Sequence, residues 1–217
     1  MSDPKQKLTG QQVADAGLDD WRPIIGVLRA RFATDDFASA ARLTQRVGEA
    51  AEAANHHPDL DLRWGRLDVA VSSHDVGGIT SRDVDLARQV SALAAEEGAR
   101  ADTASLQAVE VGLDTADADR LGPFWAAVLG GEYARNEVTD KAGDVPAMWF
   151  QDTDEHEEPR QRYHLDVWLP PEQVQPRIDA SLAAGGTLVS DAEAPSFWVL
   201  ADPDGNKACL CTWQNRG

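Results

Sequence analysis

The sequence feature that most constrains the fold is an amphipathic segment with a marked start and a marked stop. Thr34-Asp-Asp36 offers side-chain oxygens and negative charge, and both suit the first turn of a helix. Apolar residues then recur at three- and four-residue spacing as far as Ala54, which predicts one buried helix face. Asn55 tolerates left-handed backbone geometry and Pro58 forbids continuation, so the helix is predicted to end there. The two histidines between them leave the helix end with their side chains in different directions.

The flanking segments predict the rest of the first half. Residues 8–20 have the pattern of a short helix, and residues 21–32 that of a strand or hairpin. Residues 66–74 alternate between apolar and polar, as in a half-buried strand. Thr80-Ser-Arg-Asp83 has the spacing of a capping box, with Asp in place of Glu, and opens another helix. We place a domain boundary near Asp102.

Three of the five histidines, His56, His57 and His74, lie at a predicted helix end and a predicted strand end. Histidine both gives and takes protons near neutral pH, so one interpretation is a general acid–base site. A metal site of three imidazoles is a second interpretation, and structural hydrogen bonding is a third. Adjacent histidines are poor co-ligands because their side chains diverge, so the spacing disfavours the metal site. The other two interpretations stay open.

The composition narrows the class of partner. The 217 residues carry a formal net charge of −17, which argues against direct binding to nucleic acid or to an anionic membrane. The N-terminus lacks the apolar run of a signal peptide, and no stretch approaches the roughly 18 apolar residues of a membrane span. A disulfide between Cys209 and Cys211 would be strained, so no oxidising compartment is indicated. We therefore expect a cytoplasmic globular protein that acts on small molecules.

A longer motif joins the histidines: Glu52-x-x-Asn55-His-His-Pro58, an alternating strand, then Ser73-His74-x-x-x-Gly78-x-Thr80-x-x-Asp83. From about Leu8 to Leu93 the chain resembles the pterin-4a-carbinolamine dehydratase family. The resemblance implies an α+β fold, with an antiparallel sheet covered on one face by helices. It also implies a hydro-lyase that dehydrates 4a-hydroxytetrahydropterin to quinonoid dihydropterin with no metal and no cofactor.

The resemblance also implies roles for individual residues. His56 and His74 would act on the departing 4a-hydroxyl group, while His57 would bind substrate and assist as the base. The residues implied to line or orient the substrate pocket are Glu52, Asn55, Pro58, Ser72, Ser73 and Asp75. The family commonly has Trp where this chain has Leu60. Trp64 either stacks on the pterin ring instead or is a half-buried aromatic side chain at a strand start.

The second half repeats a strand, a helix and a pair of glycines, which indicates a weak internal duplication. The repeated parts are the strands 106–113 and 163–169, the helices 116–129 and 171–184, and the stops Gly130-Gly131 and Gly185-Gly186. Phe124-Trp-x-x-Val-Leu-Gly130, His164-Leu-Asp-Val-Trp168 and Asp202-Pro-Asp-Gly-Asn206 resemble the glyoxalase-like branch of the vicinal oxygen chelate superfamily. This resemblance implies paired βαβββ modules that form a curled mixed sheet, in a domain of residues 103–217 after a dehydratase-like domain of residues 1–102.

Metal-binding members of that superfamily use a His on the first strand and a Glu on the last strand of each module. His164 matches one such position, but its counterpart in the first module is Val109 and the expected Glu is Cys209. Since one ligand is too few for a divalent ion, we expect no metal, with His164 hydrogen-bonded in the sheet or lining a pocket. His156 lies in an acidic run typical of a solvated loop. The aromatic side chains that either wall an apolar ligand site or fill the core are Trp149, Trp168, Phe197 and Trp198.

The leading hypothesis is a pterin dehydratase domain joined to a metal-free domain that binds a small molecule or supports assembly. A non-enzymatic dimerisation or ligand-binding protein is one alternative. A metal-dependent glyoxalase- or dioxygenase-like activity in the second domain is another. The expected partners are a pterin substrate and further copies of the chain, as a dimer or tetramer, with no nucleic acid and no membrane.

Overall fold

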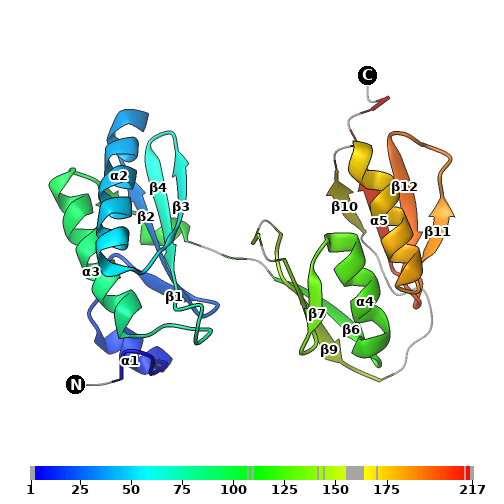
Figure 1. The fold of residues 1–217 in the computed structure, drawn as a ribbon, viewed down its shortest axis with the longest axis horizontal. Coiled ribbons are helices and arrows are strands. Elements are labelled where there is room, and N and C mark those ends of the chain that lie inside the picture. The colour runs from blue at the N-terminus through cyan, green and yellow to red at the C-terminus, as the bar shows by residue number, and fades with distance from the viewer. Residues whose placement is uncertain are drawn as a thin grey trace. The chain divides into compact units, whose positions relative to one another are not determined.

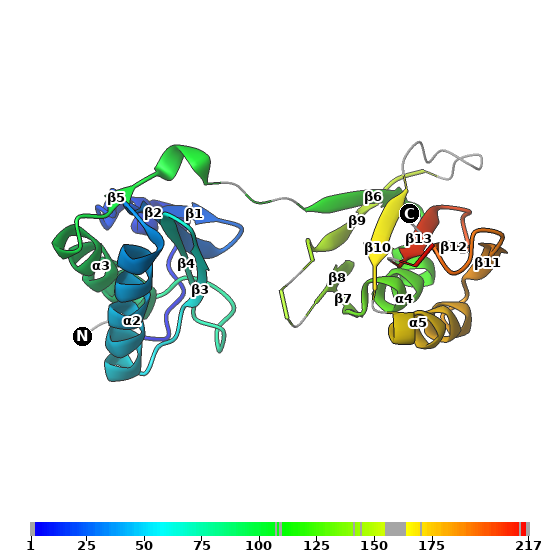
Figure 2. The same cartoon turned by 90° about the horizontal axis from the view of Figure 1, so that it is seen from above.

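The chain forms two compact units, Met1–Ala108 and Val109–Gly217, each with its own sheets and core (Figure 1, Figure 2). The computed structural model describes residues 3–106, 108, 110–140, 142–143, 145–154, 164–169, 171–212 and 214–215. His156, which the sequence places in an acidic loop, lies outside the described residues.

The first unit is an antiparallel sheet with two long helices on one face (Figure 1). Its elements are α1 (Gly10–Asp15), β1 (Arg22–Ile24), β2 (Val27–Ala33), α2 (Phe37–Ala54), β3 (Asp59–Arg63), β4 (Arg66–Val71), α3 (Ser81–Glu96), β5 (Arg100–Ala101) and the short 3₁₀ helix η1 (Thr103–Ser105). The strand order is β1-β2-β4-β3, β5 also pairs with β2, and these pairs are all antiparallel. The α+β architecture predicted for this half is confirmed.

The local sequence explains where the two long helices start and stop. The Asp36 carboxylate accepts a hydrogen bond from the Ser39 amide (2.7 Å) at the start of α2. Asn55 ends the same helix in the left-handed conformation, with φ 46°, as its sequence predicts. At the start of α3, Thr80 and Asp83 form the predicted capping box.

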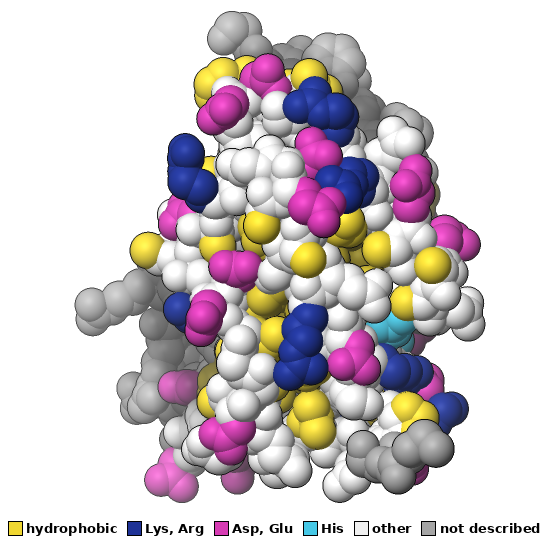
Figure 3. All heavy atoms as spheres, turned by 90° about the vertical axis from the view of Figure 1, so that its left-hand side faces the viewer, with side chains coloured by type: hydrophobic (Ala, Val, Ile, Leu, Met, Phe, Trp, Pro, Cys, Tyr) yellow, Lys and Arg dark blue, Asp and Glu magenta, His cyan; other side chains and the backbone are white. Residues whose placement is uncertain are grey.

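Ion pairs join the outer faces of α2 and α3. Arg46 pairs with Glu96 and Glu97, and Arg42 pairs with Glu97. Figure 3 shows the left-hand side of Figure 1, where basic and acidic side chains are interspersed with small apolar areas. Since partly exposed ion pairs each add little stability, burial of the apolar helix faces is the main force that holds α2 and α3 on the sheet.

The register of β3 and β4 brings the predicted site residues to one end of the sheet. Asp59, at the start of β3, pairs with Ala70, near the end of β4. Because antiparallel neighbours run past each other, residues just before β3 lie beside residues just after β4. The segment 56–58 therefore adjoins the segment 72–73.

Residues 100–105 belong to the first unit. β5 pairs with β2, and the Asp102 amide donates to the Arg31 carbonyl (2.8 Å). The Asp102 carboxylate accepts from the Ser105 amide (3.3 Å), which holds η1 together. As a result the two units separate after Ala108, beyond the predicted boundary near Asp102. The first strand of the second unit is Val111–Thr115, so the prediction of a strand over residues 106–113 placed it too early.

The second unit consists of two modules of the same construction. The first contains β6 (Val111–Thr115), α4 (Ala118–Leu129), β7 (Glu132–Ala134), β8 (Glu137–Thr139) and β9 (Met148–Asp152), and the second contains β10 (Leu165–Trp168), α5 (Pro171–Ala183), β11 (Thr187–Ser190), β12 (Phe197–Ala201) and β13 (Lys207–Cys211). The sheets have the orders β6-β9-β8-β7 and β10-β13-β12-β11, in which β6–β9 and β10–β13 are parallel. The predicted repeat of mixed βαβββ modules is confirmed.

Within the described residues, no helix is long and apolar enough to cross a membrane.

Two sequence motifs of the second unit meet in one buried contact. The Asp202 carboxylate, on a residue only 3 % exposed, accepts from the Trp125 indole N–H (3.0 Å). It also accepts from the Asn206 backbone amide and side chain (2.8 Å each) and from the Asp204 amide (2.9 Å). A buried carboxylate needs such a set of donors, so these motif residues serve the fold.

Candidate functional site

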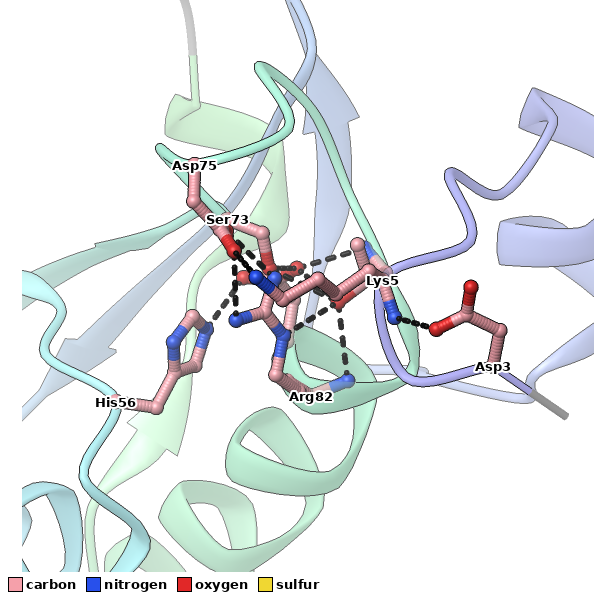
Figure 4. A network of polar contacts seen from close by, with 8 residues as sticks. Asp3, Lys5, His56, Ser73, Asp75 and Arg82 are labelled. Atoms are coloured by element: carbon pink, nitrogen blue, oxygen red, sulfur yellow. Dashed lines mark hydrogen bonds and ion pairs between the residues drawn. The ribbon is translucent and has the colours of Figure 1, made fainter. Parts of the chain in front are cut away.

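The candidate site lies where the end of α2, the end of β4 and the start of α3 come together (Figure 4). His56 follows the last turn of α2, and its Nε2 lies 2.7 Å from Oδ1 of Asp83 in the first turn of α3. The His56 side chain is 11 % exposed and the Asp83 side chain is fully buried. One nitrogen of a largely buried imidazole is thus tied to a buried carboxylate.

Asp83 has further donors on its second oxygen. Oδ2 accepts hydrogen bonds from the Ser73 hydroxyl (2.7 Å), the Thr80 amide (2.7 Å) and the Thr80 hydroxyl (3.2 Å). Ser73 and Thr80 are both buried. These bonds offset the cost of burying a carboxylate and fix its orientation.

The donors around Asp83 also determine which nitrogen of His56 is available. A carboxylate surrounded by donors acts only as an acceptor, so Nε2 of His56 carries the proton that it shares with Oδ1. In the neutral imidazole Nδ1 is then the acceptor, and in the imidazolium it becomes a second donor. Asp83 therefore orients the ring so that Nδ1 is the nitrogen able to exchange a proton with a bound molecule. General acid–base chemistry requires a group held in this way.

His57 points away from this pair. Its Nε2 lies 3.1 Å from Oε1 of Glu52, in the last turns of α2. Both side chains are exposed, His57 by 56 %. The predicted divergence of the two neighbouring histidines is therefore observed, and His57 is accessible to a molecule in solution.

His74 lies in the turn that follows β4. Ser73 and Gly78 close this turn through an isolated antiparallel bridge, and Gly77 adopts φ 63°, which an L side chain rarely takes. The His74 side chain is exposed. The preceding residue, Ser73, is bonded to Asp83, which also bonds His56. His74 therefore lies next in sequence to a residue of the His56–Asp83 group.

A cluster of charges anchors the same turn to the N-terminal segment and to α3 (Figure 4). Asp75 accepts a hydrogen bond from Arg82 (2.7 Å) and lies 3.2 Å from Nζ of Lys5. The hydrogen bond from Arg82, followed by that from Lys5, lowers the pKa of Asp75 to about 2. The amide of Leu8 donates to the carbonyl of Ile79 (2.8 Å), so the N-terminal segment contacts the turn at two points.

The remaining residues predicted to bind substrate differ in exposure. Asn55 is exposed, while Pro58 and Ser72 are half-buried. Ser72 faces the opposite side of the strand from Ser73, because successive residues of a strand alternate. Ser73 is 1 % exposed and bonded to Asp83, so its hydroxyl supports the carboxylate.

The structure also describes Leu60, where the family commonly has Trp, and Trp64, which could take the place of that Trp. Leu60 packs against the core of the first unit. Trp64 lies between β3 and β4 and is 79 % exposed, so the expectation of a half-buried aromatic side chain is wrong. An exposed indole face remains available for stacking on a ligand.

The sequence interpretation missed the central place of Asp83 and the contribution of Arg82 and Lys5. It recognised Asp83 only as a helix cap. The available signal was the capping carboxylate itself, because Oδ2 satisfies the backbone and Oδ1 is left for another donor. Nothing in the local pattern identifies that donor as His56.

In the second unit, His164 stands beside two other polar groups. Its Nε2 lies 3.4 Å from Oδ1 of Asp166, and the parallel register of β10 and β13 places Asp166 opposite Cys209. Donor atoms of the three residues all lie within 4.8 Å of one another. The expectation of a metal-free domain counted His164 alone, whereas the structure adds Asp166 and Cys209 to it.

The predicted aromatic wall is described only in part. Trp149 is 40 % exposed, Phe197 is half-buried, and Trp198 packs against the core of the second unit. The side chain of Trp168 lies outside the described residues.

A hollow of about 400 Å³ in the first unit lies between α1 and the β1–β2 hairpin, away from the predicted site residues.

Fold and site together define the class of protein. The first unit is an α+β domain with a histidine held by a buried carboxylate at one end of its sheet, and the second is a pair of βαβββ modules. The chain belongs to the pterin-4-alpha-carbinolamine dehydratase family. Residues 6–93 match the family described as pterin 4 alpha carbinolamine dehydratase, and residues 110–211 match a glyoxalase-like domain.

The following relatives each cover less than half of the chain. Over 89 residues the chain is 43 % identical to "Putative pterin-4-alpha-carbinolamine dehydratase" of Nocardia farcinica, which covers 40 % of this chain and 94 % of that protein. A solved transcriptional coactivator/pterin dehydratase from Brucella Melitensis is 28 % identical with a TM-score of 0.40, covering 41 % of this chain and 99 % of its own. A glyoxalase/bleomycin resistance protein from Albidiferax ferrireducens T118 is 21 % identical with a TM-score of 0.37, covering 48 % and 95 %.

Proposed function

We propose that the first unit dehydrates a 4a-hydroxytetrahydropterin to the quinonoid dihydropterin by histidine acid–base catalysis. The observation that carries the proposal is the contact between His56 and the buried Asp83, in a chain of the dehydratase family. Loss of water needs an acid that protonates the departing 4a-hydroxyl and a base that removes the N5 proton. Each positioned acid or base contributes about 10²–10⁴ in rate.

The three histidines divide this work according to their surroundings. His56, with Nε2 bonded to Asp83, presents Nδ1 as the group that exchanges a proton with the hydroxyl. His74 acts on the same hydroxyl from the turn after β4. His57, which is exposed and bonded to the exposed Glu52, binds the substrate and assists as base. The site residues Asn55, Pro58, Ser72 and Asp75 complete the surroundings of the substrate, and Ser73 supports the carboxylate.

The reaction requires no metal ion in this scheme, since both proton transfers are assigned to imidazoles. We further propose that the chain assembles as a homo-oligomer through its first unit. Size-exclusion chromatography with light scattering measures the oligomeric state of the full-length protein.

The test is turnover of a freshly generated 4a-hydroxytetrahydropterin by the full-length protein. The double variant His56→Ala/His74→Ala should lose the catalysed rate while its circular dichroism spectrum and unfolding midpoint stay close to wild type. The matched control is His156→Ala, a histidine of the second half, which should keep the wild-type rate. Unchanged turnover in the double variant contradicts the assignment. A wild-type protein that neither binds nor turns over pterins favours a non-enzymatic role instead.

A further inference from the structure

The strand register brings three metal-binding side chains to one face of the second module. Ala208 and Leu210 belong to the buried core, so alternation along β13 places Cys209 on the opposite sheet face. Asp166 pairs with Cys209 across the parallel β10–β13 ladder and shares that face. His164 precedes Asp166 by two positions and therefore also lies on it.

The side chains differ in exposure in a way that suits a site open to solvent on one side. Cys209 is 8 % exposed, whereas the His164 and Asp166 side chains are 57 % and 49 % exposed. The thiol thus lies at the base of the group, with the imidazole and the carboxylate toward solvent. Zinc bonds of about 2.0–2.3 Å in a tetrahedral site place donor atoms about 3.5 Å apart. The donors here lie within 4.8 Å of one another, and rotation of the two exposed side chains would bring them towards that spacing.

We propose that His164, Asp166 and Cys209 bind one divalent ion of zinc-like, thiol-accepting character. Thiolate, imidazole and carboxylate are the ligands that zinc takes in proteins, whereas magnesium, calcium and manganese favour oxygen ligands. Cys209 stands where the superfamily's metal binders have Glu, and Asp166 adds a carboxylate from β10, so the ligand set differs from the His and Glu pattern. Three protein ligands leave one position for water or a small molecule. The inference concerns the second unit alone and does not depend on the proposed dehydration.

Cobalt(II) is the probe that reads out this site without any assay of activity. The full-length protein is stripped of metal with a chelator under reducing conditions and titrated with Co²⁺. We expect one equivalent to bind and to give the intense near-ultraviolet absorption of thiolate-to-cobalt charge transfer. Zn²⁺ should displace the cobalt, and excess Mg²⁺ should not. Because metal binding displaces protons from thiol and imidazole ligands, the affinity should fall as the pH is lowered.

The variants separate a specific site from general binding to surface groups. Cys209→Ser should abolish the charge-transfer absorption and weaken Zn²⁺ binding by more than about tenfold, in line with the cost of disturbing a ligand set. Cys211→Ser is the matched control, since Cys211 is a buried thiol of the same strand that lies opposite Trp168. Asp166→Asn alters an exposed ligand, so it reports on the site even if the Cys209 variant does not fold.

Three results overturn the proposal. They are binding of less than one equivalent by the wild-type protein, absorption that persists in a folded Cys209→Ser variant, and loss that is equal in the Cys209 and Cys211 variants. Removal of metal should leave the dehydration rate unchanged, so failure of this proposal and failure of the proposed dehydration are measured separately.

Discussion

Replacing Asp83 by Asn tests whether the helix cap of α3 also sets the protonation pattern of His56. Asn has nearly the shape of Asp, but it offers one acceptor oxygen and one donor amide. The oxygen should face Ser73 and Thr80, since three donors converge on Oδ2 of Asp83. The amide then occupies the place of Oδ1, 2.7 Å from Nε2 of His56. Because an amide donates, Nε2 must become the acceptor, and the proton of the neutral imidazole moves to Nδ1.

The expected losses of rate and of stability follow from the hydrogen bonds of Asp83. In this tautomer Nδ1 of His56 already carries a proton and cannot take up another, so the dehydration rate constant should fall by about 10²–10⁴. A hydrogen bond to a charged group contributes about 1.5–3 kcal/mol and a neutral one about 0.5–1.5 kcal/mol, so Asp83→Asn should cost on the order of 3 kcal/mol of stability. Asp83→Ala should cost more, about 3–5 kcal/mol, because it removes the buried acceptor that Ser73, Thr80 and His56 share.

Three measurements separate the effect on chemistry from the effect on folding. Single-turnover kinetics with a 4a-hydroxytetrahydropterin give the rate constant, and urea unfolding gives the free energy of unfolding. Nitrogen NMR of the imidazole rings reports which nitrogen of His56 carries the proton. Asp85→Asn is the matched control, since it makes the same charge change two residues along α3, on a side chain 69 % exposed.

Two outcomes would show that Asp83 does not act on turnover through His56. If the His56 proton has moved to Nδ1 and the rate of Asp83→Asn still equals that of Asp85→Asn, the orientation of His56 does not set the rate. If the rate falls only in proportion to the unfolded fraction, Asp83 acts on stability alone.

Three further predictions concern single positions. The pKa of Asp75 is lowered from 3.8 to about 2, so the folded state binds fewer protons than the unfolded state between these values, and the contribution of Asp75 to stability is present above pH 4 and lost as the pH falls towards 2. Asp75→Asn should therefore flatten the pH dependence of urea unfolding in that window. Asp202→Ala should lower the unfolding free energy of the second unit by about 2–4 kcal/mol, because Trp125 and Asn206 lose a buried acceptor, without changing the dehydration rate. Asn55→Gly should keep stability within about 1 kcal/mol, since Gly accepts φ 46°, and should raise KM for the pterin; an unchanged KM excludes the Asn55 side chain from substrate binding.

Features set by neighbouring residues are predictable from this sequence. The limits of α2 follow from Asp36 and Asn55, whose side-chain and backbone chemistry act within a few residues. The capping box at Thr80 and the alternation of β4 are local in the same sense. The family motif adds the two histidine segments, and the structure places them at one end of the sheet through the register of β3 and β4.

Features that depend on which distant groups meet are not predictable in this way. The contact of His56 with Asp83 joins residues 27 apart, and it exists because α2 and α3 pack on the same sheet face. The grouping of Asp166 with Cys209 depends on the parallel pairing of β10 with β13, which no local pattern records. The position of the domain boundary also depends on distant contacts, because the pairing of β5 with β2 and the bond from Asp102 to Arg31 hold this segment in the first unit.

One histidine of the site is largely buried and two are exposed, and the dual use of Asp83 explains this difference. A carboxylate that caps a helix is fixed by backbone groups, so a ring bonded to it gains a defined orientation that a flexible surface partner cannot supply. His57 shows the contrast, since its partner Glu52 is 80 % exposed and is not fixed by a helix cap. The orienting part of the site is therefore built into the folding of α3, and the histidines proposed to meet the substrate lie on accessible segments. It follows that changes at Asp83 should alter stability and turnover together, whereas changes at His57 and His74 should alter turnover alone.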